Sequence, residues 1–257
     1  MVILKTAGDI AAMREAGRIS SAALREAGKA VEPGISTLEI DSIIRRFIEK
    51  QGAKPSFLGY GGFPASACIS VNNVVIHGIP GASQILREGD IVSIDVGAFY
   101  KGWHGDNAYT FPCGKVSERA QALMDTTREA LYEGIRQAVP GNRTGDIGNA
   151  VQRYVEARSY SVVRDFVGHG VGAKLHEDPN VPNYGTQGKG VRLLPGMVIA
   201  IEPMVNEGTC RVKVLSDGWT TVTSDGKLSA HFEHTVAITS KGPVILTEPD
   251  EVTKWTL

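Results

Sequence analysis

The stretch GDIVSIDVGAFYKGWHGDNAYTF, residues 89–111, decides the fold that we predict for this chain. Its first arm, residues 91–97, alternates between apolar and other side chains, which is the period of a half-buried strand, and Asp95 is its one charged residue. Its second arm, residues 102–111, is rich in aromatic and β-favouring residues. The two arms therefore predict an antiparallel hairpin with an aspartate on each arm, Asp95 and Asp106.

The turn of this hairpin determines which residues face each other. A two-residue turn at Tyr100-Lys101 would place Asp106 directly opposite Asp95, where like charges are destabilising unless something positive lies between them. Tyr-Lys is a poor sequence for such a turn, which favours Gly or Asn, so Gly97 or Gly102 could form a longer loop and shift the register. Only an even shift keeps both carboxylates on one face. A lone strand aspartate is most often solvated or hydrogen-bonded, but two on one apolar hairpin favour a ligand role.

Composition and charge indicate an ordinary globular protein. The 257 residues carry a formal net charge of -1, so the sequence has no basic footprint for nucleic acid. The longest apolar stretches, such as residues 197–201, are far shorter than the roughly 20 residues of a membrane span, and residues 1–5 are too short for a signal peptide. The three cysteines are widely spaced and include no C-x-x-C pair, which argues against a disulfide framework and a thiolate metal site. We therefore expect a cytoplasmic protein with reduced cysteines.

Helix-capping signals and hydrophobic spacing predict the elements around the hairpin. A possible cap at Thr6 precedes the first apolar helical face, and Ser36 with Glu39 forms a capping-box sequence ahead of the second. Helices are predicted for residues 9–30, 36–51, 117–139 and 146–158, and strands for residues 68–76 and 161–167.

This order of elements occurs twice, at a constant offset of 107 residues. The offset superposes Pro33-Gly34 on Pro140-Gly141, and it carries IVSID, residues 91–95, onto VIAIE, residues 198–202. Chance matches are expected among common residues, but the run of matches ends on a carboxylate in the same strand position. Duplication of a half of roughly 110 residues is the better interpretation.

Packing of the two halves about a pseudo-twofold axis would bring Asp95 close to Glu202. The second half then needs a return arm, which residues 229–238 supply, with Glu233 in the place of Asp106 at an offset of 127. Four carboxylates that converge in a β-lined interior cannot all stay ionised without cations, because each charge raises the pKa values of its neighbours. Two divalent metals would resolve this conflict.

A histidine supplies a further type of ligand. His169 lies between Gly168 and Gly170 at the end of an apolar strand, and the glycines leave room for it to approach a buried site, although a structural histidine at a turn is the alternative. One imidazole with four carboxylates fits Mn, Fe or Co better than a thiolate-type zinc site, and Zn with His and carboxylate ligands remains an alternative. Paired ions that activate a bridging water and polarise a carbonyl indicate hydrolytic chemistry.

Three motifs that are typical of other enzyme classes are incomplete or absent. The GHGVG sequence at residues 168–172 has Leu175 where a dinucleotide loop needs glycine, and His176-Glu177 lacks the second histidine of H-E-x-x-H because position 180 is Asn. The sequence also has no G-x-S-x-G, so a serine nucleophile elbow is absent.

Over nearly its whole length the chain resembles the type I methionine aminopeptidases of the short bacterial form. The motifs SIDVG, HGDNAYTF, VGHGVG, IEPM and FEHT contain the matching metal ligands, which are Asp95, Asp106, His169, Glu202 and Glu233. The resemblance implies the α/β pita-bread fold, in which antiparallel strands of two pseudo-symmetric halves enclose a dinuclear metal site. It also implies a single catalytic domain, residues 1–257, with a pseudo-repeat of roughly residues 1–111 and 112–240.

The resemblance implies an activity and a role for each matching residue. The enzyme would remove the initiator methionine from nascent polypeptides when the second residue is small, using two ions of Co, Mn, Fe or Zn. The aspartates and Glu233 would hold or bridge both ions, while His169 and Glu202 would bind one. Glu202 would also act as general base for the bridging water. His77 and His176 would contact the substrate amide and stabilise the tetrahedral intermediate.

The pocket for methionine is also implied by the resemblance. Phe57 and Leu175 differ from the Cys and Phe of the enterobacterial enzymes, and His231 stands where a Gln is common. The pocket positions are Phe57, Tyr60, Cys68, Leu175 and Trp219, and the positions that match a monovalent-cation site in some members are Asn72, Val74 and Ser229. Implied partners are nascent N-termini and the ribosome near its exit tunnel, for a protein that is a monomer in the cytoplasm.

Two other functions are compatible with parts of this pattern. An X-prolyl peptidase or prolidase would use the same five ligands, but those enzymes usually carry a separate N-terminal domain. A non-catalytic pita-bread protein that binds ribosomes or nucleic acid would have lost ligands that are all present here. Type II methionine aminopeptidases carry a long insertion between the positions of His169 and the last ligand, which this sequence lacks.

Overall fold

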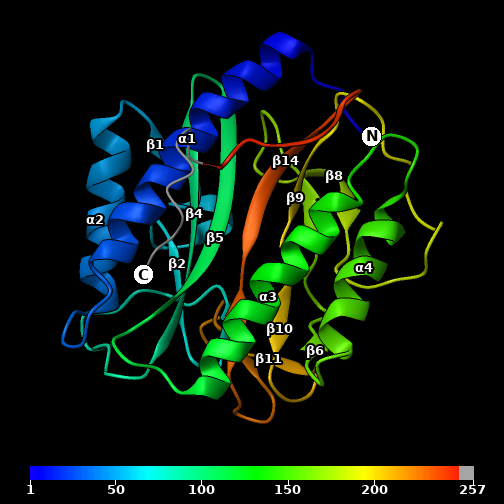
Figure 1. Ribbon diagram of the computed structural model, residues 1–257. Coiled ribbons are helices and arrows are strands. Elements are labelled where there is room, and N and C mark those ends of the chain that lie inside the picture. Colours follow the sequence, from blue (N-terminus) through cyan, green and yellow to red (C-terminus); the bar gives the residue numbers. More distant parts are fainter. Residues whose placement is uncertain (249–257) are drawn as a thin grey trace.

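Two pairs of helices pack against one side of a curved antiparallel sheet in the computed structural model, which describes residues 1–248 (Figure 1). The helices are α1 (Ala7–Lys29), α2 (Thr37–Lys50), α3 (Glu118–Arg136) and α4 (Thr144–Glu156). All four predicted helices are thus confirmed. The predicted cap at Thr6 is present and forms a capping box with Asp9 on α1, and the predicted box of Ser36 and Glu39 caps α2. The α/β class is confirmed as well.

The strands form one nine-stranded sheet and two small three-stranded sheets. The large sheet runs in the order β1-β4-β5-β14-β9-β7-β8, with β2 beside β4 and β15 beside β14. The strands are β1 (Lys54–Pro55), β2 (Cys68–Val71), β3 (Val74–Ile76), β4 (Ile91–Tyr100), β5 (Trp103–Pro112), β6 (Ser161–Val162), β7 (Gly168–Gly170), β8 (Glu177–Val181), β9 (Val198–Ile201), β10 (Met204–Asn206), β11 (Val212–Val214), β12 (Thr221–Thr223), β13 (Ser229–His231), β14 (Glu233–Thr239) and β15 (Gly242–Ile245).

The bounds of the elements repeat along the chain at the offset seen in the sequence. Helices α1 and α3 end at Lys29 and Arg136, and α2 and α4 begin at Thr37 and Thr144. Strands β1 and β6, and strands β4 and β9, begin at positions with the same separation. In Figure 1 the helix pair α1/α2 and the helix pair α3/α4 flank the central strands β5 and β14. This equal spacing supports the interpretation that the chain contains two related halves.

The central hairpin turns one residue later than a turn at Tyr100-Lys101 would require. Strands β4 and β5 pair continuously, and the turn consists of Lys101 at φ 49 and Gly102 at φ 90, both in the left-handed region. This is the backbone that a two-residue hairpin turn needs. Asp95 therefore faces Ala108, and Asp106 faces Gly97. The two aspartates lie on one face but on a diagonal, so the predicted direct opposition is wrong while the predicted shared face is confirmed.

The second half has a different register between its two equivalent strands. Ile94 pairs with Tyr109 in the first half, whereas its counterpart Ile201 pairs with His234 and not with Val236, which an offset of 127 would require. Because of this shift, Glu233 lies two residues along the chain from the position that is structurally equivalent to Asp106. The predicted strand at residues 229–238 is also interrupted, because β13 ends at His231 and β14 begins at Glu233.

The two halves meet where β5 and β14 lie side by side, and we call this contact the seam. Its ladder contains two residue pairs, Glu233 with Ala108 and His234 with Asn107. Threonine hydroxyl groups extend it. The Thr235 hydroxyl donates to the Asp106 carbonyl at 2.7 Å and accepts from the Asp106 N–H at 3.0 Å. Thr110 makes the same two contacts with the main chain of His231, at 2.8 and 3.0 Å.

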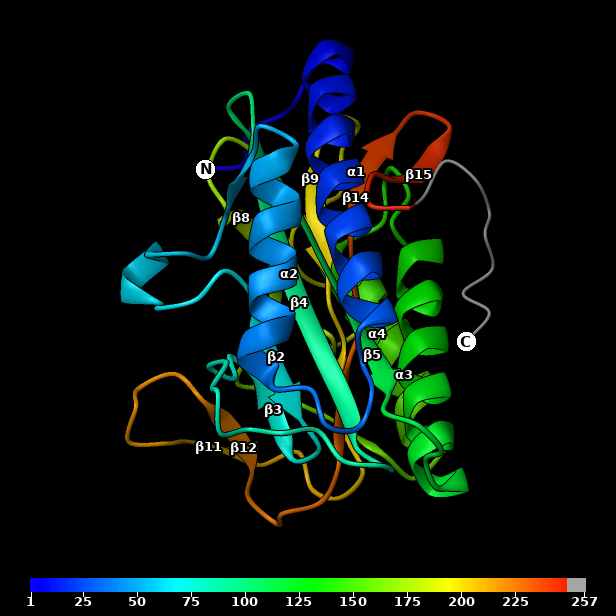
Figure 2. The ribbon, with the colours of Figure 1, turned by 90° about the vertical axis from the view of Figure 1, so that its left-hand side faces the viewer.

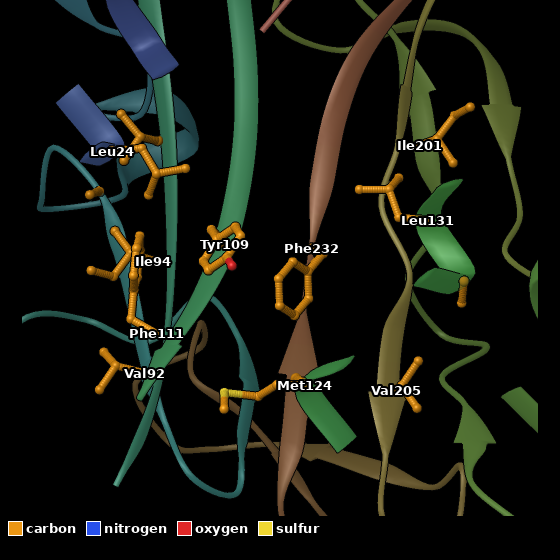
Figure 3. Close-up of a cluster of buried hydrophobic side chains, with 14 of the residues drawn as sticks. Leu24, Val92, Ile94, Tyr109, Phe111, Met124, Leu131, Ile201, Val205 and Phe232 are labelled. Atoms are coloured by element: carbon orange, nitrogen blue, oxygen red, sulfur yellow. The ribbon is translucent and has the colours of Figure 1, made fainter. Parts of the chain in front are cut away.

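The main hydrophobic core lies between the sheet and the helices and spans the seam (Figure 3). The ring of Tyr109 from β5 packs edge-on against Phe232, at 4.7 Å between centroids, and lies at the same distance from Phe111. Helix α1 approaches the sheet so closely that a Cβ on Gly105 would lie 2.4 Å from the Gly17 nitrogen. The core therefore fixes one face of the central strands and leaves the carboxylates on the other.

Two predicted strands are shorter than expected. Residues 68–76 form two strands, because Asn72 adopts φ 56 and breaks the run between β2 and β3. Only residues 161–162 of the predicted strand 161–167 are extended and paired, with β10 as their partner. Between β10 and β13 the chain leaves the sheet to form the hairpin β11–β12, which projects beside β3 in Figure 2. This insertion has no counterpart in the first half.

Candidate active site

A single cavity of about 190 Å³ gathers all the residues predicted as metal ligands or substrate contacts. It opens between strands of both halves and the loop before η1 (Tyr60–Gly62), a short 3-10 turn. Its lining residues are Phe57, Tyr60, Phe63, Cys68, Ile76, His77, Asp95, Asp106, Phe166, Val167, His169, Leu175, His176, Glu202, Trp219 and Glu233.

Four carboxylates at the floor of the cavity are buried and short of partners. Asp95 is 9% exposed, Asp106 3%, Glu202 6% and Glu233 2%. One carboxylate oxygen each of Asp95, Asp106 and Glu233 is buried without any hydrogen bond. Unpaired buried charges are costly, so these oxygens need either protons or cations.

The same burial shifts the pKa values of all four groups upward in the metal-free protein. Desolvation raises the pKa of Asp106 to about 7, against a smaller opposing effect of the Asn107 N–H. Desolvation also raises the pKa of Asp95, of Glu202 and of Glu233 well above their ordinary values, and the charge of Asp106 adds to each of these shifts. Divalent cations would remove this conflict by compensating the negative charge.

His169 presents one free ring nitrogen to the carboxylates. Its Nδ1 lies 2.9 Å from the Gly170 carbonyl, so Nδ1 carries the proton and Nε2 keeps its lone pair. Nε2 lies 3.5 Å from Glu202 Oε1 and 3.9 Å from Asp106 Oδ2. Burial lowers the pKa of His169 to about 3, with a further contribution from His176, and the imidazole is therefore neutral as a metal ligand must be.

The glycines around His169 have the predicted effect of leaving room. A Cβ on Gly168 would lie 2.3 Å from the Ala200 carbonyl oxygen, and one on Gly170 would lie 2.2 Å from that of Asp178. Neighbouring strands can approach β7 only because these positions lack side chains. His169 itself lies within β7, and not after a strand as the sequence suggested.

These donors fit divalent metal ions. Ligand atoms of Asp106, His169 and Glu233 all lie within 4.8 Å of one another, and Asp95 and Glu202 line the same cavity. The set consists of carboxylate oxygens and one imidazole nitrogen, which suits Mn, Fe, Co or Zn. Cys68 also lines the cavity, but burial and the nearby Asp95 raise the pKa of its thiol well above the ordinary value, so it remains protonated.

His77 and His176 both line the cavity. The His176 ring lies 4.1 Å from that of His169, and its Nδ1 is 2.7 Å from the Tyr60 hydroxyl. His77 packs edge-on against Phe166 and Trp219, at 5.5 and 5.9 Å between centroids. Burial lowers the pKa of His77 to about 4, with a smaller contribution from His176, so His77 is a neutral hydrogen-bonding group at neutral pH.

Aromatic and apolar side chains form the remaining walls. Phe57 fits because Gly97 lies beneath it, where an added Cβ would be 2.8 Å from Phe57 Cε1. Trp219 comes from the insertion and packs edge-on against Phe63 at 5.2 Å. Cys68 pairs with Asp95 across β2 and β4, which explains how it reaches the wall.

Sequence reasoning missed several residues of this cavity. Phe63, Ile76 and Phe166 line it but lie outside the quoted motifs, and Val167 begins the VGHGVG motif without having been singled out. His231 is 1% exposed, and its Nε2 lies 3.7 Å from Glu202 Oε2.

The predicted cation positions lie together outside this cavity. The Ser229 N–H donates to the Asn72 carbonyl at 2.9 Å, and Val74 begins the neighbouring strand β3. Binding of a monovalent cation there stays a prediction.

No helix within residues 1–248 is long and apolar enough to cross a membrane. The sequence matches the profile of metallopeptidase family M24 over residues 11–240. Methionine aminopeptidase 1 of Bacillus subtilis is 56% identical over 247 residues, which cover 96% of this chain and 99% of that protein. A methionine aminopeptidase of Clostridium perfringens is 57% identical over the same shares.

Solved structures agree with these matches. The methionine aminopeptidase of Thermotoga maritima superposes with a TM-score of 0.95 at 48% identity, covering 97% of this chain and all of that chain. A prolidase of Pyrococcus horikoshii superposes with a TM-score of 0.78 at 23% identity, over 98% of this chain and 65% of that chain. The second match shows a shared fold alone, and together they confirm the expected pita-bread architecture.

Proposed function

This chain belongs to the methionine aminopeptidases of metallopeptidase family M24, and we propose that it removes N-terminal methionine from polypeptides at the buried carboxylate cluster. One observation carries the assignment of the site. Three carboxylate oxygens are buried without partners beside a histidine whose Nε2 is free to bind metal. Cations bound there would compensate the buried negative charge.

The metal ligands in this proposal are Asp95, Asp106, His169, Glu202 and Glu233. Divalent ions bound there would supply a water of lowered pKa and polarise the scissile carbonyl. The chain contributes the orientation of the ligands. The Gly170 carbonyl fixes the tautomer of His169, and Thr235 holds the main chain of Asp106 from both its N–H and its carbonyl.

Glu202 is the proposed general base. Its Oε1 faces His169 Nε2 at 3.5 Å, and its Oε2 faces His231 Nε2 at 3.7 Å. In this position the carboxylate can take a proton from the attacking water and deliver it to the leaving amide nitrogen. Such proton transfer requires a group within hydrogen-bond reach of the reacting atoms, and the cavity floor provides that proximity.

His77 and His176 are the proposed contacts to the substrate backbone. The Tyr60 hydroxyl occupies Nδ1 of His176, which leaves Nε2 free toward the cavity. His176 would donate a hydrogen bond to the oxygen of the tetrahedral intermediate, and His77 would contact the substrate amide. Burial keeps the pKa of His77 at about 4, so neither role depends on a charged His77 at neutral pH.

The walls indicate a preference for methionine. Phe57, Tyr60 and Trp219 offer ring faces, and sulfur–aromatic contacts are worth roughly 0.3 to 1.5 kcal/mol. An unbranched thioether can fill a cavity of about 190 Å³ between such rings. Because the scissile bond must reach ions held between strands, the second residue should be small: Gly, Ala, Ser, Thr, Cys, Pro or Val.

The finer features of the proposal concern metal, partners and location. We assign two ions of Co, Mn, Fe or Zn, and a monovalent cation near Asn72, Val74 and Ser229. The substrates would be the N-termini of nascent polypeptides. The protein would act on them as a monomer in the cytoplasm, near the exit tunnel of the ribosome. The resemblance to the short bacterial enzymes supports these assignments.

Removal and return of metal test the proposal. Exhaustive chelation should abolish hydrolysis of a Met-Ala-Ser peptide, and Mn, Co or Fe should restore it while the melting temperature rises with metal added. Verified metal-free protein that retains full activity would refute the metal site. Comparable kcat/KM for Met-Ala-Ser, Leu-Ala-Ser and Met-Lys-Ser would refute the proposed specificity.

A further inference from the structure

A buried ion pair joins the N-terminal segment to the loop that carries His176. Lys5 Nζ lies 2.6 Å from Glu177 Oε2, and their side chains are only 2% and 5% exposed. Most ion pairs of the described residues lie at the surface, where they contribute little to stability. Removing two charges from water is costly, and an apolar pair of similar volume is often at least as stabilising. A buried pair of this kind therefore calls for a reason other than stability.

Lys5 is fixed at both its main chain and its side chain. Its N–H donates to the Gly196 carbonyl at 2.7 Å, and its ammonium group also donates to the Ile3 carbonyl at 3.0 Å. A Cβ on Gly196 would lie 2.9 Å from the Lys5 carbonyl oxygen, so the segment rests directly on the turn before β9. The ammonium group thus has a fixed position from which to hold a partner.

Glu177 uses its two oxygens for different purposes. Oε2 accepts from Lys5, and Oε1 accepts from the Lys174 N–H at 3.1 Å. The carboxylate also covers Gly172, where an added Cβ would lie 2.3 Å from Oε1. Glu177 itself begins β8 and pairs with Gly170, the residue after His169.

Glu177 holds the main chain at Lys174 by the hydrogen bond that Oε1 accepts. Only two residues lie between Lys174 and Glu177, and both line the cavity. They are Leu175, a buried wall residue, and His176. His176 is exposed, and its side chain hydrogen-bonds Tyr60, which is 44% exposed, and packs against the His169 ring at 4.1 Å between centroids. These contacts orient the ring, and the distance over which the ring can reach depends on the main chain that carries it.

We propose that Lys5 and Glu177 are positioning residues that hold the Lys174–Glu177 loop so that His176 reaches the reacting carbonyl. The proposal rests on the proposed role of His176 and deepens it. Neither Lys5 nor Glu177 is among the lining residues of the cavity, but their ion pair can act in this way because small displacements of a catalytic group have large effects on rate.

Lys5→Met keeps the aliphatic length of the side chain and removes its charge. In the metal-loaded, full-length protein, kcat for Met-Ala-Ser should fall by about 10²-fold, the scale associated with misplacement by roughly 1 Å. The bound metal per chain should stay at the wild-type value, since Lys5 touches none of the ligands. Lys29→Met is the matched control, because it removes the same group from an exposed pair with Glu26, 71% and 42% exposed, and should leave kcat unchanged.

Lys5→Met leaves Glu177 as a lone buried charge, so a folding defect must be separated from misplacement. The double variant Lys5→Met/Glu177→Gln removes both charges and should fold as judged by its melting temperature, yet show the same loss of kcat. A folded double variant with wild-type kcat would overturn the proposal.

A double-mutant cycle with His176→Ala shows whether the pair acts through His176. In the His176→Ala background, Lys5→Met should lower kcat by less than about threefold, because the group it positions is already gone. Equal losses in both backgrounds would overturn the proposal.

The crystal structure of metal-loaded Lys5→Met gives a readout independent of activity. It should show the His176–Tyr60 hydrogen bond lost and the loop displaced, and an unmoved loop would refute the positioning role. If His176→Ala alone leaves kcat unchanged, the proposed role of His176 fails, and a displaced loop in Lys5→Met would still show that the ion pair holds it.

Discussion

The two halves of the molecule place their carboxylates by different means. In the first half, β4 and β5 have ten residues each and are joined by a two-residue turn, so one continuous ladder fixes Asp95 and Asp106. In the second half, Glu202 follows β9 directly and Glu233 begins β14, with four shorter strands between them. Both pairs nevertheless line the same cavity.

The difference between the halves separates two tasks of the site. Asp95 and Glu202 occupy equivalent positions 107 residues apart, and Asp106 and Glu233 come from the return strand of each half, so both halves contribute carboxylates to the proposed metal site. The groups that would touch substrate come from places where the halves differ. Trp219 lies on the insertion, and the position 107 residues before His176 holds Ile69. The carboxylates of the proposed metal site therefore come from both halves, whereas His169 and the proposed substrate contacts His176 and Trp219 come from places where the halves differ.

The largest expected effect distinguishes Asp95 from its repeat counterpart Glu202. Both Asp95→Asn and Glu202→Gln should weaken metal binding, because each removes a negative charge. At saturating Mn, Asp95→Asn should regain much of its activity, while Glu202→Gln should stay about 10² to 10⁴-fold below wild type because it lacks the base. Metal titrations with a Met-Ala-Ser assay measure this. Equal rescue of the two variants would show that the halves are equivalent in chemistry as well as in metal binding.

A second effect concerns stability, and here the halves should behave alike. Folded-state pKa values above the ordinary ones mean that the folded metal-free protein binds more protons, so its stability falls as pH rises. The buried histidines have lowered pKa values and act in the opposite direction, but only below their ordinary value of 6.5.

The window for this measurement therefore lies above pH 6.5. There the free energy of unfolding of metal-free protein should fall by about 1.4 kcal/mol per pH unit for each carboxyl group still protonated. Denaturant titrations from pH 6.5 to 8.5 measure the slope, and bound metal should flatten it. Asp95→Asn and Glu202→Gln should each reduce the slope by similar amounts, and a slope unaffected by either would contradict the shared floor.

A third, smaller effect tests the asymmetric wall. Trp219→Leu should lower the preference for Met-Ala-Ser over Leu-Ala-Ser by about tenfold, since apolar pockets separate such side chains by about 1 to 3 kcal/mol. Phe57→Leu, on the first-half wall, should have the lesser effect because Trp219 also packs against His77 and Phe63. Metal content should not change in either variant. If Trp219→Leu leaves the ratio of kcat/KM for Met-Ala-Ser to that for Leu-Ala-Ser unchanged, the insertion does not contribute to specificity.

The smallest effect tests the turn that sets the first-half register. Gly102 has φ 90 and no neighbour within 4 Å of an added Cβ, so Gly102→Ala should cost only the backbone strain, about 1 kcal/mol. Lys101→Asn should be neutral or slightly stabilising, because Asn tolerates the φ of 49 found there. Thermal melts measure both, with kcat as the control. A large loss of activity in Gly102→Ala would mean that the register depends on this turn more than on the ladder.

Features with local causes were predictable from the sequence. Each capping box, at Thr6 and at Ser36, depends on two residues only three positions apart, and both boxes form as expected. The candidate ligands were found because alternation and the repeat place them on one face. Their convergence in one cavity followed from the strand pattern and the resemblance, and the structure brings them together.

Features that depend on distant contacts were not predictable. The turn includes Lys101 in the left-handed region, which its residue type does not favour. Asp95 therefore pairs with Ala108, two residues away from the predicted partner Asp106. Asn72 breaks a strand that composition alone would continue. Phe166 reaches the cavity only through the path of the chain between β6 and β7, and it has no local pattern that marks it.

The seam has a consequence for how the halves can exist. Without the other half, β5 would be an open edge strand and β14 would lose its partner at Glu233 and His234 while β15 still covers residues 236–239, and exposed edges promote aggregation. Antiparallel pairing about a twofold axis is self-complementary, as in an isologous dimer. A separated half would accordingly need a second copy of itself, both to cover its edge and to complete the set of carboxylates. Fusion into one chain lets each half cover the edge of the other without an encounter between molecules, and it frees the second half to acquire the insertion that the first half lacks.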